Sequence, residues 1–459
     1  MSEPAAEPAS EPVSGPGVER KPRRAALITA LLLFAAVGVI LVVTTPWNPL
    51  PGHVPGGRAT PDPALDFTPA QIARSRAFDD ALNPVAYGRL VVGLLVVLAL
   101  GLTPLGARLI GRTTARVRRW PLRVMVAAAV LAVVLRLAAL PFGVWGESVL
   151  RRYGLSTQSW PAWLLDQLKS LAVAWVMWTI VLLLLFALVR RFPRYWWTGA
   201  AAGAFVLVVA GSFLYPVAVE PVFNKFHSLP AGTLRTDLLA MAERDGVPVE
   251  DVLVADASRR TTSLNAYVSG FGSTRRIVVY DTLLKSPPAR IESIVAHELG
   301  HAKNNDVPAG TMIGALGVAG AVCVLYLLLS SPRLLRRAGV PERDGSGVNG
   351  GDGPADVRTV ALLLALFAVA MQIGGPVQNL ISRHIEARAD VHALDLTRDP
   401  GTFVSMQHEL SVRNISDLTP NGLERLLWMS HPAGPERIAM ARDWARMHGV
   451  PAPPPLNRR

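Results

Sequence analysis

The chain has 459 residues, of which 51% are hydrophobic and only 17% charged, and its formal net charge is +12. In soluble domains about a quarter of the residues are charged. The charged residues that are missing here are replaced by long apolar runs, so the composition excludes an ordinary soluble protein. We expect no nucleic-acid partner, because the excess positive charge is mostly arginine beside the apolar runs and the sequence contains no recognisable nucleic-acid-binding motif. The single cysteine, Cys323, excludes an intrachain disulfide and a cysteine-based zinc site.

The chain begins with a segment rich in Pro, Ala, Glu and Ser that ends in a basic cluster. It holds too few apolar side chains to offset the entropy of ordering, so we expect residues 1–24 to form a disordered tail. The apolar run at 25–43 follows directly. Its polar leader is long and no small-residue cleavage site follows, which favours a retained membrane anchor over a secretory signal.

Six further apolar segments follow, at 90–107, 124–144, 170–189, 197–217, 309–330 and from about 359 onward. A membrane-spanning helix needs about 20 residues, so the sequence predicts about seven spans. The last is apolar only briefly and continues past Pro376 into a polar helix. Arg136, within the third span, should face the interior of the bundle or a wet cavity, or extend toward the membrane surface.

Two polar segments remain, 218–308 and 382–450. The pattern of 218–308 predicts a helix at 233–243 and strands at 252–254, 265–268 and 276–280, whereas that of 382–450 is helical. Together they are large enough for one α+β domain. The expected division is a tail at 1–24, a five-span region at 25–217, the domain's first part at 218–308, a two-span hairpin at 309–381, the second part at 382–450 and a tail at 451–459. The connection at 339–354 reads as a flexible loop.

The sequence around residue 297 combines a helical pattern with metal-binding residue types. Ser286 can cap a helix whose first position is Pro287, and apolar residues then recur at helical spacing. His297 and His301, four residues apart, project from one face of this helix and can bind the same metal ion. Glu298 is poorly placed as a ligand, but it lies where it can accept a proton from a metal-bound water and pass it to a leaving amine.

A second motif, S-R-H-I-E-A-R-A-D, ends at Asp390 just beyond the last span. A catalytic zinc site needs a third protein ligand, and Glu386 has the type and setting for it. Asp390, one helical turn later, can accept the ring N–H of His297. The sequence therefore predicts one Zn²⁺ per chain, held by His297, His301 and Glu386. His384 lies on another face of the same helix and is set aside. We expect His392 to be solvated. Four other histidines have no second ligand at a suitable spacing, so we expect no functional role for them: His53, His227, His408 and His448.

These motifs resemble a known family. H-E-L-G-H at 297–301, the motif at 382–390 and S-H-P-A-G-P-E-R-I at 430–438 are similar to those of the type I CAAX prenyl endopeptidases, whose wider group includes the heat-shock membrane metalloproteases of bacteria. The resemblance runs from about residue 67 to residue 438 and includes E-P-V-F-N-K-F at 220–226 and N-A-Y at 265–267. The expected fold is a multi-span α-helical membrane protein with a zincin-like α+β metallopeptidase domain, interrupted by a two-span hairpin.

The resemblance also implies roles that the sequence alone would not assign. Asn265, Ala266 and Tyr267 would form an edge strand that pairs with an extended peptide. His431 would bind substrate or stabilise the tetrahedral oxyanion, and Arg437 would brace the site or contact the substrate.

The expected function is zinc-dependent hydrolysis of peptide bonds, with Glu298 as general base and with peptides or membrane proteins in the lipid bilayer as substrates. Nothing in the sequence indicates prenyl binding. An intramembrane protease of the site-two type is one alternative, but the flanks of the H-E-x-x-H helix are too polar for hydrocarbon. The other is a catalytically silent membrane scaffold or transport-related protein with a structural zinc site.

Basic residues precede the first span and occupy the connections between spans two and three, four and five, and six and seven. These connections should be cytoplasmic, which places the catalytic segments on the extracytoplasmic side. In the eukaryotic members of the family the catalytic side faces the cytosol, so the two arguments disagree. The Arg- and Ala-rich composition points to a high-GC bacterium and hence to its plasma membrane.

Overall fold

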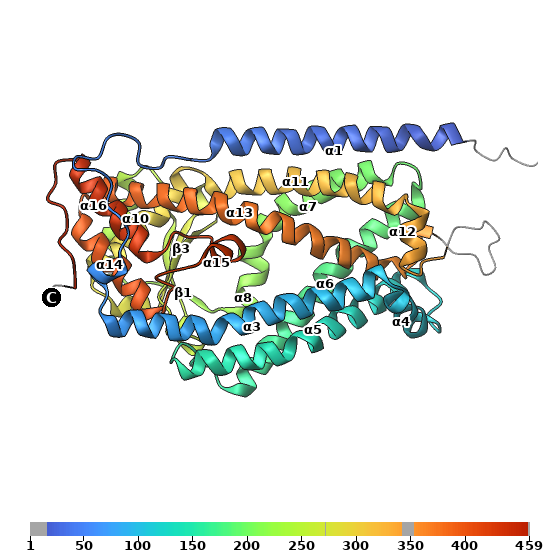
Figure 1. Cartoon of the computed structure of the whole chain (residues 1–459), viewed down its shortest axis with the longest axis horizontal. Helices are drawn as coiled ribbons and strands as arrows, with labels where there is room; N and C mark the ends of the chain where they lie inside the picture. Colours follow the sequence, from blue (N-terminus) through green and yellow to red (C-terminus); the bar gives the residue numbers. More distant parts are fainter. Residues whose placement is uncertain (1–15, 271, 342–352, 458–459) are drawn as a thin grey trace, which may run out of the picture.

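A computed structural model describes residues 16–270, 272–341 and 353–457 (Figure 1). Long helices run side by side over most of its length, and a domain of shorter helices and a small sheet forms one end. Within the described residues, seven helices are long and apolar enough to cross a membrane, which confirms the predicted count. They are α1 (Pro16–Thr44), α3 (Pro69–Leu102), α5 (Trp120–Arg152), α6 (Trp160–Arg191), α7 (Trp196–Leu214), α11 (Asp306–Leu329) and α13 (Thr359–Thr397). A π-helical turn (Tyr215–Val219) extends α7 into the short helix α8 (Glu220–Phe223).

The first helix begins earlier than expected. Residues 1–15 of the predicted tail lie outside the described residues, but α1 starts at Pro16, so the prediction of disorder is wrong for residues 16–24. The basic residues before the apolar run continue its helix. Arg23 donates a hydrogen bond to the carbonyl of Ser330 at the end of α11, which fixes this end of α1 to its neighbour.

The second span ends at Leu102 and not at residue 107. Thr103 is extended (φ −128°, ψ 167°), and a separate helix, α4 (Pro104–Thr114), starts at Pro104. A proline disfavours the helical conformation of the residue before it, so Pro104 explains the break at Thr103. In the third span, Arg136 donates from Nη1 to Gln167 Oε1 at 2.8 Å and so connects α5 to α6.

The sheet of the domain has the strand order β1-β2-β4-β3. Its strands are β1 (Phe226–Ser228), β2 (Asp251–Ala255), β3 (Ala266–Ser269) and β4 (Arg276–Tyr280), which confirms the three predicted strands to within two residues. Only β2 and β4 are parallel. β3 is an edge strand, and Asn265, predicted as part of it, lies just before it and accepts a hydrogen bond from Tyr280 N.

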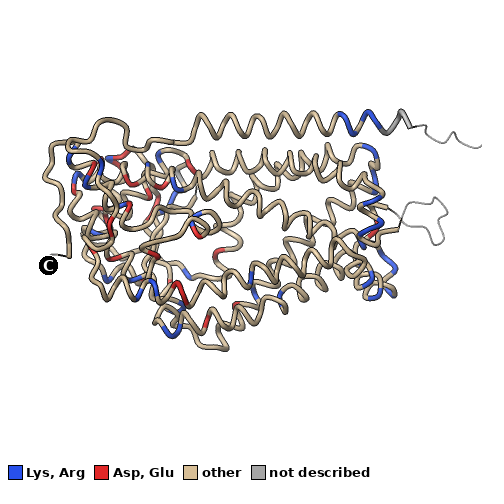
Figure 2. Tube along the Cα trace, in the orientation of Figure 1, with Lys and Arg blue, Asp and Glu red and all other residues tan. Residues whose placement is uncertain are grey.

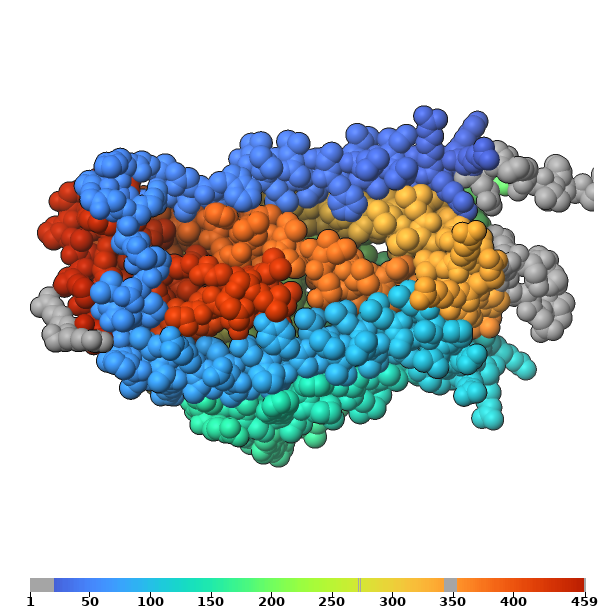
Figure 3. All heavy atoms as spheres, in the orientation of Figure 1, coloured from blue at the N-terminus to red at the C-terminus, as the bar shows by residue number. Residues whose placement is uncertain are grey.

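Shorter helices complete the domain. They are α2 (Pro63–Asp66), α9 (Thr233–Arg244), α10 (Pro288–Lys303), α14 (Pro400–Arg413), α15 (Gly422–Leu427) and α16 (Gly434–Met447), with α12 (Pro332–Arg337) at the opposite end of the molecule. Figure 3 shows the chain between α1 and α2 crossing the outer surface of the domain. The Ala59 amide donates to Asp443 Oδ1 of α16 at 2.8 Å, which fixes this segment in place.

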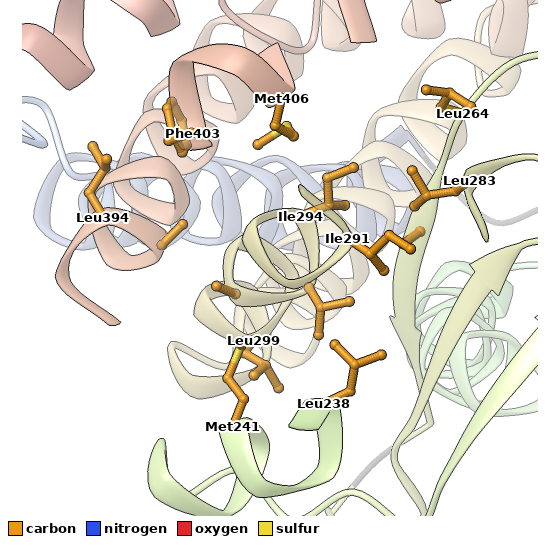
Figure 4. Close-up of a cluster of buried hydrophobic side chains, with 14 of the residues drawn as sticks. Leu238, Met241, Leu264, Leu283, Ile291, Ile294, Leu299, Leu394, Phe403 and Met406 are labelled. Atoms are coloured by element: carbon orange, nitrogen blue, oxygen red, sulfur yellow. The ribbon is translucent and has the colours of Figure 1, made fainter. Parts of the chain in front are cut away.

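The central helix of the domain is α10. Its apolar face, with Ile291, Ile294 and Leu299, is buried against α9, the sheet and α14 (Figure 4). Each such side chain contributes about 1.5–3 kcal/mol when fully buried, so this core fixes the orientation of α10. Ser286 does not cap the helix as expected. Pro287 occupies that position, and the Ser286 hydroxyl donates to Glu409 Oε1 on α14.

Candidate metal centre and active site

The buried face of α10 determines where its polar side chains point. With the apolar residues of α10 in the core, His297 and His301 project together toward α13, four residues apart on one face. His297 is only 6% exposed. Gly300 allows α10 to approach α13 closely, since a Cβ there would lie about 3.0 Å from the His392 side chain.

Glu386 reaches the two histidines from α13. Its Oε2 lies 3.1 Å from His297 Nε2, and its Oε1 lies 3.6 Å from His301 Nε2. The two histidine Nε2 atoms are 3.2 Å apart. Ligands bound tetrahedrally at 2.0–2.1 Å to one zinc ion would be about 3.3 Å apart, so these three side chains fit a single ion with little movement. The structure thus brings together His297, His301 and Glu386, the three residues that were predicted as ligands from the two motifs.

The surrounding carboxylates favour positive charge at the centre. Burial alone would lower the pKa of His301, but its hydrogen bonds to Asp306 and Glu386 and the nearby carboxylate charges raise this pKa to about 10. A cation bound at this centre would interact favourably with the same carboxylates and would take the place of the proton on His301.

Asp390 lies behind His297. Its Oδ1 is 2.8 Å from His297 Nδ1, the contact expected from the sequence. Arg437 of α16 donates from Nε to Asp390 Oδ2 at 2.7 Å and from Nη2 to Oδ1. Asp390 is fully buried, and these bonds compensate its charge there. Arg437 is not among the described residues that line the cavity beside Glu386, which is described below, so its position favours bracing the site over contact with a bound molecule.

A second aspartate, which the sequence interpretation missed, lies behind His301. Asp306 Oδ2 is 2.9 Å from His301 Nδ1, and Arg388 of α13 binds Asp306 Oδ1. The available signal was an acidic residue five positions after the second histidine. It is weak, because in a continuous helix that residue would point about 140° away from the histidine.

A cavity of about 480 Å³ opens beside two of the three candidate ligands, His301 and Glu386, whereas the buried His297 does not line it. Its lining includes Glu298, His301 and Glu386 from the helices and Asn265, Ala266 and Tyr267 from β3 and the residue before it. Burial raises the pKa of the Glu298 carboxyl above its ordinary value, against the opposing charges of the two histidines. The cavity therefore joins a potential base, the candidate metal ligands and an exposed strand edge.

His431 also lines this cavity. Its Nε2 lies 3.2 Å from Glu386 Oε2, and Ser430 Oγ lies 2.9 Å from its Nδ1. The side chain is more than half exposed, so a molecule in the cavity can reach it.

The histidines set aside as ligands lie outside the cluster, but one expectation about them is wrong. His392 is not solvated: its Nε2 lies 2.9 Å from Asp245 Oδ2, and Lys303 also binds that buried aspartate. These contacts join α13 and α10 to the end of α9. His384 packs edge-on against Trp47.

Two family sequence models match this chain. The model described as CAAX prenyl protease N-terminal, five membrane helices, matches residues 86–225. The model of peptidase family M48 matches residues 228–445, a range that contains all the candidate ligands. The chain belongs to peptidase family M48. It is a metalloprotease of the membrane, in the branch of the CAAX prenyl proteases.

Relatives of this family member span most of its length. The uncharacterized metalloprotease YhfN of Bacillus subtilis is 28% identical over 407 residues, which are 85% of this chain and 90% of that protein. CAAX prenyl protease 1 of Saccharomyces cerevisiae is 27% identical over 316 residues, 66% of this chain and 68% of that protein. The crystal structure of Ste24p from S. mikatae has a TM-score of 0.72 at 20% identity and covers 91% of this chain and 98% of its own. This likeness shows that the two chains share the same multi-helix fold.

Proposed function

We propose that this metalloprotease is a zinc endopeptidase that cleaves extended peptide segments, with His297, His301 and Glu386 as zinc ligands. One observation carries the proposal: two imidazole nitrogens and one carboxylate, from helices far apart in the chain, converge at distances that suit one ion and open onto a cavity. Nitrogen and oxygen donors of this kind are the usual set of a catalytic zinc site.

When bound, zinc lowers the pKa of a water molecule to about 7 and polarises the scissile carbonyl. Glu298 is the base that removes a proton from the attacking water, and it then delivers that proton to the leaving amine. Burial raises the pKa of this carboxyl, which is the direction that favours its taking up a proton. His431 can donate a hydrogen bond to the oxygen on which negative charge develops.

The strand β3 provides the peptide-binding edge. Asn265 and Tyr280 form a hydrogen-bonded pair, and in an antiparallel ladder such pairs alternate with pairs that do not bond to each other. The N–H and C=O groups of Ala266 and Val268 therefore point away from β4. A peptide that adds to this edge passes Glu298 and the ligands along the cavity.

The proposed substrates are peptides or membrane proteins that can present such an extended segment. The yeast relative is named CAAX prenyl protease 1 and the rice relative is named its homolog, so a prenylated C-terminal peptide is the first specific substrate to compare with an unmodified one.

We place the catalytic domain on the extracytoplasmic side of a bacterial plasma membrane. The long-helix end opposite the domain carries a dense group of Lys and Arg with few acidic residues, whereas the domain carries both signs (Figure 2). Basic connections remain in the cytoplasm.

The test uses the full chain purified in detergent. Zinc content and peptide cleavage are measured for the wild type and for Glu298→Gln, which removes the base and keeps the shape of the side chain. The proposal expects about one zinc per chain in both proteins and cleavage only by the wild type. Equal cleavage by both would defeat the assignment of Glu298, and zinc without cleavage in the wild type would favour a silent scaffold with a structural zinc site.

A further inference from the structure

Asp306 lies against His301 on the side of the ring away from Glu386. Asp306 Oδ2 is 2.9 Å from His301 Nδ1, whereas His301 Nε2 faces His297 Nε2 at 3.2 Å and Glu386 Oε1 at 3.6 Å. When one imidazole nitrogen binds a metal, the other is an N–H, and the acceptor of that N–H fixes both the tautomer and the ring plane. Asp306 therefore has the position of a partner to a ligand and not that of a ligand.

We propose that Asp306 is a positioning residue of the metal centre, which holds His301 with Nε2 directed at the ion. This inference rests on the proposed zinc site. Arg388 on α13 binds Oδ1 of Asp306 and leaves Oδ2 to His301. Arg388 is two residues from Glu386, so the helix that supplies the third ligand also anchors the carboxylate that orients the second.

The arrangement repeats the one on the other side of the centre. There Asp390 accepts from His297 Nδ1 and is itself bound by Arg437. His297 binds Asp390 of α13, whose arginine comes from α16, and His301 binds Asp306 of α11, whose arginine comes from α13. The Asp306 side chain is 12% exposed whereas that of Asp390 is fully buried, so water can partly replace the Asp306 contact. We therefore expect the loss of zinc affinity at Asp306 to lie toward the lower end of the range of about 10–100-fold that is typical of such partners.

The backbone is shaped to make this contact. Asn305 adopts a left-handed conformation (φ 54°), which ends the path of α10 and starts α11 at Asp306. Left-handed backbone is costly for most residues, but Asn tolerates it. Arg275 donates to Asn305 Oδ1 at 3.1 Å and so holds the turn. The turn swings Asp306 back over His301, which a continuous helix would not do.

The competing explanation is that Asp306 and Arg388 only form an ion pair between α11 and α13. Zinc affinity separates the two explanations, because an ion pair without influence on His301 would not change it. The matched control is Glu409→Gln, which removes the negative charge that pairs with Arg290 (2.6 Å), a residue of the same helix α10. Arg290 is seven positions before His297 and lies outside the metal centre.

The experiment measures the zinc dissociation constant by competition with a chromogenic chelator, and the visible spectrum of the cobalt-substituted protein. Asp306→Ala is expected to bind zinc about 10–100-fold more weakly and to alter the cobalt spectrum, while Glu409→Gln matches the wild type. If Asp306→Ala cannot be recovered folded, Arg388→Gln keeps the aspartate but removes its anchor, and it should bind zinc more weakly than the wild type. Wild-type affinity in the tested variant overturns the role of Asp306 and leaves the zinc site intact. A wild-type protein that binds no zinc would instead defeat the proposed function itself.

Discussion

Glu386 Oε2 lies 3.1 Å from His297 Nε2, although the two residues are 89 positions apart and two membrane-spanning helices, α11 and part of α13, separate them in the chain. The packing of α10 on α13 creates this contact, because residues so far apart in the sequence cannot meet through local secondary structure alone. Any change that alters this packing should therefore affect the metal before it affects the fold.

Glu386→Ala should lose most of its zinc, because only two protein ligands remain. Asp390→Asn keeps all three ligands but weakens the hold on His297, so zinc affinity should fall by about 10–100-fold. Metal analysis after dialysis against a buffered zinc concentration distinguishes the two variants. Full zinc occupancy in Glu386→Ala would mean that another residue is the third ligand.

The motif residues were predictable from the sequence because their spacing is local. A helix places His297 and His301 on one face wherever it lies, and the Glu386 motif could be paired with it by residue type and by resemblance. Asp306 could not be predicted in this way, since its approach to His301 depends on the left-handed Asn305. The helix break at Thr103 was predictable from Pro104, but the apolar run continues across this proline and therefore indicated one uninterrupted span.

The exposed edge of β3 yields a kinetic prediction. Val268→Pro removes an N–H that points toward the cavity and breaks no hydrogen bond to β4, and proline is accepted at such edge positions. The loss of one peptide hydrogen bond should lower kcat/KM by about 2–10-fold with the zinc content unchanged. An unchanged kcat/KM for long peptides would argue against binding along this strand.

The start of α16, which carries Arg437, depends on a glycine. A Cβ at Gly434 would overlap the hydroxyl of the buried Ser411, so Gly434→Ala should cost about 1–3 kcal/mol and lower the thermal unfolding temperature in detergent. Adding Ser411→Ala should restore much of the loss. Gly422→Ala is the control, because a Cβ there meets open space. A Gly434→Ala protein as stable as the wild type would show that α16 adjusts freely.

Orientation in the membrane follows from the basic end of the helices. A reporter that is active only in the cytoplasm, fused after Val450, should be inactive, whereas the same reporter fused before Arg20 should be active. Activity of the fusion after Val450 would reverse the assignment.

The most direct test of the metal centre is an anomalous-scattering map of the crystallised protein, recorded at the zinc absorption edge. The account predicts one strong peak at about 2.0–2.2 Å from His297 Nε2, His301 Nε2 and a Glu386 carboxylate oxygen. A peak elsewhere, or zinc-loaded protein in which Glu386 does not contact the peak, would contradict it.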